Sequence, residues 1–166
     1  MILTSVIVSW NRPALLARTI QSLREHSRYP IIVVDNASAI ETTDLIRSIT
    51  SETERLLLPT NVGINRAIEQ ALTRCQTGYV HVGDADIQYL EPLDAALEVL
   101  GKSAFAASYQ DSPEHQSYGC ESAVGRTWIL KRTERGAALF LRTEYLRSLQ
   151  PFPNKLTEFD WWICRD

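Results

Sequence analysis

Short apolar runs alternate with segments of helical periodicity through the first half of the chain, and no other feature constrains the fold as strongly. The runs cover residues 3–9, 31–34, 56–58 and 79–82. Their unbroken apolar character is typical of strands that are buried on both faces. Between them, apolar residues recur every three or four positions, as they do on one face of a helix. This order predicts the α/β class, with a mainly parallel central sheet and helices on both of its faces.

Local signals predict where the helices begin and end. Pro13 suits the first turn of a helix, and the apolar spacing then continues to about His26. Ser38, with Glu41 three residues later, predicts a capping box for a second helix. A third helical segment stops near Gly78.

The second half of the chain is less regular. A further helix is expected after Pro92, and a strand at residues 103–108. Polar residues with glycine and proline predict a long loop over residues 109–126. The apolar runs at residues 127–130 and 137–141 flank a charged turn, which predicts an antiparallel pair added to the sheet, followed by a short helix.

Composition limits the classes of function. The chain has 166 residues, enough for one domain with a hydrophobic core, and we expect residues 1–166 to form a single domain. A net charge of −3 argues against binding to nucleic acid. Three widely spaced cysteines indicate a reducing compartment, and the N-terminal apolar run is too short to span a membrane. We therefore expect a cytoplasmic location, or the cytoplasmic face of a membrane within a larger assembly, and no transmembrane segment in this chain.

Two acidic residues follow the strand predicted at residues 79–82. Asp84 and Asp86 stand one residue apart after Gly83, at the end of a strand where open α/β sheets bind their ligands. If this segment is extended, both carboxylates point the same way. Two hard oxygen ligands suit Mg²⁺ or Mn²⁺ carrying a substrate diphosphate. The alternative is an ordinary turn, in which aspartate bonds its own backbone.

Other polar residues follow the remaining strands. Asp35 ends the second strand, so its carboxylate can accept a hydrogen bond from a nucleotide, form an Asx-turn, or do both. Asn11 and Arg12 precede the first helix, where anions bind readily, although Arg12 can equally be a solvated arginine. Asn61 and Gly63 can serve a turn and a helix cap alone.

Six segments gain meaning when they are read together. They are residues 5–13 (SVIVSWNRP), 31–38 (IIVVDNAS), 61–67 (NVGINRA), 78–86 (GYVHVGDAD), 136–142 (GAALFLR) and 157–162 (TEFDWW). In this order and spacing the chain resembles the family-2-type glycosyltransferases of the GT-A fold. The resemblance implies a single Rossmann-like GT-A domain with a small antiparallel addition near its C-terminus.

The resemblance also implies an activity and its site. The expected reaction transfers a sugar from a nucleotide-diphosphate sugar, first of all a UDP-sugar, to a hydroxyl of a glycan, a lipid or another acceptor, with inversion. Asp86 would bind Mn²⁺ or Mg²⁺ directly, and Asp84 would contact the ribose or reach the metal through water. The residues implied at the nucleotide are Ser9, Asn11, Arg12, Asp35, Asn61, Gly63 and Asp84.

The acidic segment near the C-terminus resembles the one that holds the catalytic base of this family. Asp160 is the expected general base, and Glu158 is the second candidate. Trp161 and Trp162 beside Asp160 can form an apolar wall on which a sugar stacks. Thr157 with Asp160 three residues later can instead cap a terminal helix.

Two other functions compete with this hypothesis. The chain ends just after the acidic segment, where family members commonly continue. It can therefore be a truncated or degenerate domain that binds a nucleotide sugar or a partner without turnover. A sugar nucleotidyltransferase has a similar sheet but a glycine-rich phosphate loop, and residues 10–13 contain no glycine. Of the histidines, His81 alternates with valines as a buried strand histidine does, and His115 is a weak candidate for a metal ligand.

Overall fold

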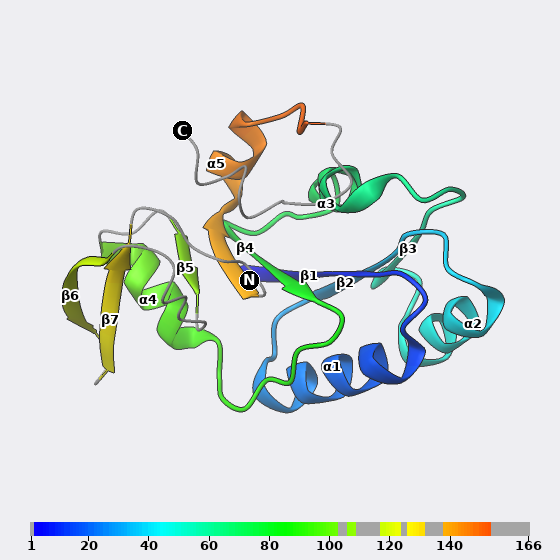
Figure 1. Ribbon diagram of the computed structural model, residues 1–166, viewed down its shortest axis with the longest axis horizontal. Coiled ribbons are helices and arrows are strands. Elements are labelled where there is room, and N and C mark those ends of the chain that lie inside the picture. The colour runs from blue at the N-terminus through cyan, green and yellow to red at the C-terminus, as the bar shows by residue number, and fades with distance from the viewer. Residues whose placement is uncertain (1, 103–105, 109–116, 124–125, 132–137, 154–166) are drawn as a thin grey trace.

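The computed structural model describes residues 2–102, 106–108, 117–123, 126–131 and 138–153, and a six-stranded sheet lies at its centre (Figure 1). The strands lie in the order β3-β2-β1-β4-β8-β5. Their bounds are β1 Leu3–Ser9, β2 Ile31–Asp35, β3 Arg55–Leu57, β4 Tyr79–Asp84, β5 Ala106–Ser108 and β8 Ala138–Arg142. Strands β1 to β4 pair in parallel, β8 is antiparallel to β4, and β5 is antiparallel to β8. The predicted mainly parallel α/β sheet is confirmed.

Helices cover both faces of this sheet. One face carries α1 (Pro13–His26), α2 (Ile40–Ile49) and α4 (Asp94–Lys102), and the other carries α3 (Gly63–Leu72) and α5 (Thr143–Ser148). Figure 1 shows α1 and α2 below the sheet and α3 and α5 above it. No helix in the described part of the chain is long and apolar enough to cross a membrane.

The central strands divide the core into two layers. In β1, Leu3 and Ile7 pack in the layer with α1, whereas Val6 packs in the layer with α3. All three side chains are fully buried. Because each central strand is covered on both faces, most of its residues on either face are apolar, and this accounts for the apolar runs in the sequence.

The pairing of the later strands differs from the prediction. β7 (Arg126–Lys131) pairs with β6 (Ser117–Ala123) in a separate two-stranded sheet, while β8 inserts between β4 and β5. Phe140 of β8 packs in the α1 layer, and Leu139 and Leu141 pack in the α3 layer. An added hairpin covered on one face could not bury both sets, so β8 belongs inside the main sheet. An antiparallel addition is therefore present, but the predicted partner of β8 is wrong.

Three smaller expectations also change. The predicted loop at residues 109–126 contains β6, and residues 109–116 lie outside the described residues. The predicted capping box is wrong, because α2 starts after Ala39 without a side-chain cap and the Ser38 hydroxyl accepts a hydrogen bond from the Asn11 N–H at 3.0 Å. α3 ends at Leu72 instead of near Gly78, because its last turn tightens into hydrogen bonds between residues three apart.

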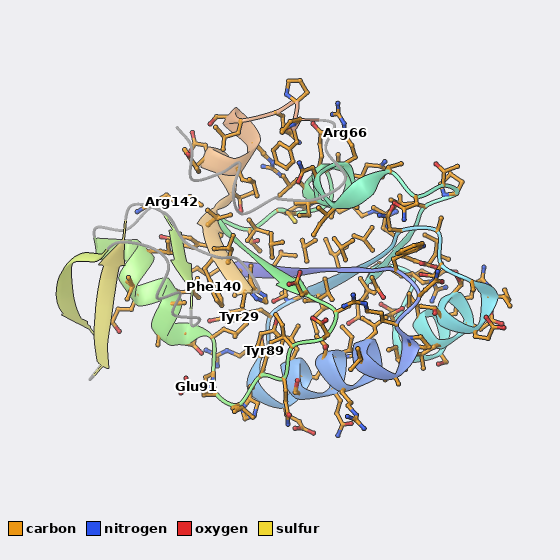
Figure 2. All side chains as sticks on the ribbon, viewed as in Figure 1. Tyr29, Arg66, Tyr89, Glu91, Phe140 and Arg142 are labelled. Carbon is orange, nitrogen blue, oxygen red and sulfur yellow. The ribbon has the colours of Figure 1, made fainter. Side chains whose placement is uncertain are left out.

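His81 of β4 is a buried structural histidine, as its alternation with valines indicates. Its Nδ1 lies 3.2 Å from Ser5 Oγ, and its Nε2 lies 3.2 Å from Tyr89 Oη. The ring stacks on Phe140 with centroids 4.5 Å apart. Burial lowers the pKa of His81 to about 3, so the imidazole is neutral at ordinary pH. Tyr89 and Phe140 lie on the same side of the sheet (Figure 2).

Gly83 makes room for this cluster, and a side chain at that position should destabilise the protein. An added Cβ would lie 2.4 Å from Tyr89 Oη and 2.9 Å from both His81 Cε1 and Ile7 Cδ1. Gly83→Ala should therefore lower the free energy of unfolding by about 1–3 kcal/mol, measured by urea denaturation. Gly78→Ala is the matched control, because a Cβ there meets no heavy atom within 4 Å. Equal losses in the two variants would contradict a packing requirement at Gly83.

Candidate functional site

The carboxyl ends of β1, β2 and β4 meet at one edge of the sheet, and the predicted site residues gather there. The strand register places Ser9 opposite Asp35, and Val8 opposite Asp84. The Asn36 N–H donates to the Ser9 carbonyl at 2.9 Å and ties the first two strand ends together. This is the edge at which open α/β sheets bind ligands.

Asp84 and Asp86 both lie at this edge, but they do not share an extended segment. β4 continues through Asp84 and a turn begins at Ala85, so the turn that the sequence analysis kept as the alternative is present, and the extended segment on which the shared direction of the two carboxylates depended is not. Ala85 is buried in the core layer of α1, whereas Asp86 is exposed. Burial of Ala85 draws the chain out of the sheet toward α1, which carries Asp86 toward the first turn of that helix.

Arg12 and Asp86 form an ion pair across the site. Arg12 Nη1 donates to Asp86 Oδ2 at 2.5 Å, and the two side chains are 56% and 39% exposed. The sequence suggested a phosphate or solvent as the partner of Arg12, and it did not predict this carboxylate. The pair joins the loop after β1 to the loop after β4, 74 positions apart.

The oxygen donors at this edge fit a hard divalent cation. Asp84 and Asp86 offer carboxylate ligands of the kind that Mg²⁺ and Mn²⁺ prefer. The charge of Asp84 also reaches the neighbouring core, where burial and this carboxylate raise the pKa of Tyr89. Within the described residues no group of three or more His, Cys, Asp or Glu side chains is placed so that it could hold a metal ion by itself. Mg²⁺ sites commonly use only one or two carboxylates of the protein, and substrate phosphate oxygens and water supply the other ligands.

Two polar residues on the inner face of α1 hold the loop that follows Asp86. Thr19 Oγ1 donates to the Ile87 carbonyl at 2.8 Å, and Ser22 Oγ accepts from the Tyr89 N–H at 3.1 Å. Both side chains are buried. Sequence reasoning missed them, although a signal was present: they are polar residues, three apart, within the apolar stripe of α1. These two hydrogen bonds from α1 therefore help to fix the position of Asp86.

The carboxylate of Asp35 is buried and organises the turn after β2. Oδ1 accepts from the Ser38 N–H at 2.9 Å, and Oδ2 accepts from Thr43 Oγ1 at 2.6 Å. The side chain is 2% exposed. The carboxylate thus bonds the backbone N–H three residues on, one position beyond the Asx-turn that the sequence suggested, and adds a bond to α2. Each oxygen retains a lone pair for a further donor.

Asn11 joins the loops that follow β1 and β2. Its Oδ1 accepts from the Ala39 N–H at 2.6 Å, and its own N–H donates to Ser38 Oγ. Asn11 has a φ of 53° and Ala37 has a φ of 61°, a left-handed conformation that asparagine tolerates better than most residues. The amide oxygen of Asn11 is therefore engaged in positioning the loops.

Asn61 and Gly63 belong to a second network beside it. Asn36 Nδ2 donates to Asn61 Oδ1 at 3.0 Å, and Asn36 Oδ1 accepts from the Val62 N–H at 2.9 Å. Asn61 Oδ1 also accepts from the Gly63 N–H at 3.0 Å, and the φ of Gly63 is 77°, which favours glycine. The turn role is present, whereas α3 begins after Val62 without a side-chain cap, and Asn36 is a structural member that the sequence did not single out.

Of the remaining predicted residues, the structure describes Ser9 alone. Ser9 lies at the end of β1, and its buried hydroxyl has no hydrogen-bond partner in the described structure. His115, Glu158 and Asp160 lie outside the described residues. The structure therefore brings together the predicted nucleotide and metal residues and leaves the predicted base as a sequence-based expectation.

Comparisons with known proteins identify the class. The profile of glycosyl transferase family 2 matches residues 4–116, more than half of the chain. The chain therefore belongs to glycosyl transferase family 2. No curated protein matches the sequence significantly.

Solved structures share the fold. The mannosyltransferase PcManGT from Pyrobaculum calidifontis, in complex with GDP-Man and Mn²⁺, has a TM-score of 0.75 at 19% identity, over 97% of this chain and 50% of that one. TarS 1–349 from S. aureus in complex with UDP-GlcNAc has a TM-score of 0.71 at 16% identity, over 99% of this chain and 52% of that one. The likeness confirms the predicted GT-A fold. The present chain spans about half the length of these two proteins.

Because the Asp35 side chain is buried and hydrogen-bonded, its removal should destabilise the protein. Removal of an exposed carboxylate would have little effect. Asp35→Ala removes the acceptor of the half-buried Ser38 N–H and leaves the Thr43 hydroxyl only its longer bond to the Ala39 carbonyl, so it should lower the free energy of unfolding by about 1–3 kcal/mol. Asp44→Ala on α2 is the control, because Asp44 is exposed and pairs with Arg47 three residues later, so the loss in free energy of unfolding should be within about 0.5 kcal/mol. Chemical denaturation measures both. An Asp35→Ala protein as stable as the parent would show that these two bonds contribute nothing.

Proposed function

We propose that this protein is a glycosyltransferase that moves a sugar from a nucleotide-diphosphate sugar to an acceptor hydroxyl, with a divalent cation and with inversion. The observation that carries the proposal is the pair Asp84 and Asp86 at the end of β4, beside the ends of β1 and β2, in a family 2 chain. PcManGT bound to GDP-Man and Mn²⁺, and TarS bound to UDP-GlcNAc, support a nucleotide-sugar donor. The family match favours this function over a sugar nucleotidyltransferase.

Each strand end has a part in donor binding under this proposal. Asp35 accepts a hydrogen bond from the base or ribose with its remaining lone pairs, and Ser9 offers a buried hydroxyl nearby. Asn11, Asn61 and Gly63 keep the surrounding loops in place. Because these loops are already bonded to one another, little ordering is required when the nucleotide binds.

The acidic residues Asp84 and Asp86 serve the donor diphosphate through the divalent cation. Asp86 holds the cation directly, and Asp84 meets the ribose or reaches the cation through water. A bound divalent cation supplies Lewis-acid neutralisation of the leaving diphosphate, worth several kcal/mol. The donor proposed first is a UDP-sugar, with a GDP-sugar next, and the acceptor is a hydroxyl of a glycan, a lipid-linked sugar or a similar molecule.

The acceptor hydroxyl needs a base. We assign this role to Asp160, with Glu158 as the alternative. The carboxylate takes the hydroxyl proton while the oxygen bonds to the anomeric carbon, and the bond to the diphosphate oxygen breaks on the opposite side. One bond forms and one breaks on opposite faces, so the configuration inverts.

Nucleotide binding should depend on a divalent cation through Asp86. Asp86→Ala should abolish the Mn²⁺-dependent part of UDP or GDP binding measured by calorimetry, because a direct ligand is lost. Asp94→Ala is the control, since Asp94 is an exposed acid of α4 that bonds Tyr29. A thermal-shift panel of UDP, GDP, dTDP and CDP sugars, with and without Mn²⁺, identifies the donor, and a ligand at ~100 times its Kd should add roughly 2.7 kcal/mol. Unchanged cation dependence in Asp86→Ala would remove Asp86 from the site.

Asp160 should separate binding from chemistry. Asp160→Asn retains the shape and an acceptor oxygen but cannot take a proton, so donor binding should survive while transfer falls by roughly 10²–10⁴-fold. Glu158→Gln is the matched control and should have the milder effect. Both rates are measured on any acceptor that the parent protein glycosylates.

The opposite pattern in these two variants would make Glu158 the base. If neither variant affects turnover, the acidic segment is a helix cap. A parent chain that binds donor but shows neither transfer nor donor hydrolysis across a broad acceptor panel would support the binding-module alternative.

A further inference from the structure

We propose that Arg12 exchanges partners when the donor binds: it holds Asp86 beforehand, releases Asp86 to the arriving divalent cation, and then contacts the donor diphosphate. This inference rests on the proposed function, because it concerns the same metal and nucleotide site. It treats the phosphate contact that the sequence suggests for Arg12 and the ion pair with Asp86 as two successive states of one side chain.

The ion pair places the guanidinium on the carboxylate that a cation would need. Arg12 Nη1 and Asp86 Oδ2 are 2.5 Å apart. Direct coordination of a cation by Asp86 and this hydrogen bond compete for the same carboxylate. Because Asp86 is exposed and a cation can approach it from solvent, the competition is between two positive groups for one anion.

The side chain of Arg12 can leave without disturbing the main chain. The Arg12 carbonyl accepts the first hydrogen bond of α1 from the Leu16 N–H at 2.9 Å, and Asn11 before it is tied to Ser38 and Ala39. The side chain itself is 56% exposed. The exchange therefore needs only rotation about the side-chain bonds of Arg12, while its main chain stays in place.

Asp86 is equally independent of Arg12. Thr19 and Ser22 hold the loop that follows it through their bonds to Ile87 and Tyr89, and buried Ala85 anchors the preceding position. An exposed ion pair contributes little, equivalent to a factor of about five in an equilibrium constant at most. The carboxylate thus remains in place when the arginine departs, and the exchange is readily reversible.

Charge explains why the exchange accompanies donor binding. The Arg12 guanidinium brings one positive charge to Asp86, whereas a divalent cation brings two. A cation on Asp86 then repels the guanidinium. A diphosphate next to the cation offers several anionic oxygens that match the planar fork of arginine, and such charge-assisted bonds are stronger than neutral ones.

Cation binding without nucleotide tests the first half of the exchange. Free Mn²⁺ is followed by its electron paramagnetic resonance signal during titration with the full 166-residue protein. Arg12→Gln should bind Mn²⁺ roughly two- to fivefold more tightly than the parent, because the competing pair is lost. Arg18→Gln is the matched control, since it removes the same charge from an exposed position on the same helix, and it should match the parent. In an Asp86→Asn background, Arg12→Gln should have no further effect.

Nucleotide binding at saturating Mn²⁺ tests the second half. UDP and GDP, measured by calorimetry, should bind Arg12→Gln about tenfold more weakly or worse, because a charged hydrogen-bond donor to the diphosphate is lost. Arg12→Lys should recover part of this affinity, since it retains the charge but not the fork.

The outcomes separate this inference from the proposed function. Unchanged or weaker Mn²⁺ binding by Arg12→Gln, with cation-dependent nucleotide binding intact in the parent, overturns the exchange and leaves the glycosyltransferase proposal standing. Tighter Mn²⁺ binding with unaltered nucleotide affinity overturns the diphosphate contact. A parent protein that binds no nucleotide with Mn²⁺ overturns the proposed function and the exchange together.

Discussion

The hydrogen-bonded register of β1 with its two parallel neighbours is the constraint on which the rest of the molecule depends. β1 lies between β2 and β4, and the register aligns Ser9 with Asp35 and Val8 with Asp84. A shift of one residue would turn the alternate side chains of β1 toward the wrong core layer. Such a shift would exchange Leu3 and Ile7 of the α1 layer with Val6 of the α3 layer and would separate Ser5 from buried His81, so the packing that stabilises the sheet also aligns the strand ends that form the site.

The polar groups at this edge serve the fold and the site together. Asp35 and Asn61 accept from backbone N–H groups of their own loops, and Asn11 accepts from the Ala39 N–H of the loop after β2. The loops after three strands are therefore held by side chains that the sequence suggests for the nucleotide. Such a site is organised before its ligand arrives. The Arg12–Asp86 pair differs, because it is exposed and contributes little to stability, and is therefore the part of the edge that can rearrange.

Behind the acidic residues lies a buried cluster that packs against β4. Neutral His81 bridges Ser5 and Tyr89, and the absence of a side chain at Gly83 lets Tyr89 pack close to the strand. Ser22 holds the backbone of Tyr89. The chain leaving β4 is therefore supported from the sheet and from α1, which keeps Asp84 and Asp86 near the first turn of that helix.

The sequence by itself determined the alternation of strands and helices, the parallel sheet and the edge at which Asp35, Asp84 and Asp86 lie, because apolar periodicity and strand ends are local properties. Tertiary structure alone decided where β8 pairs, since residues 138–141 are apolar on both faces and only the sheet centre covers both. It also decided that Arg12 meets Asp86 and that Thr19 and Ser22 hold the loop after β4. These contacts join residues that are 67 to 74 positions apart in the sequence, and a local sequence pattern does not specify contacts between residues so far apart in the chain.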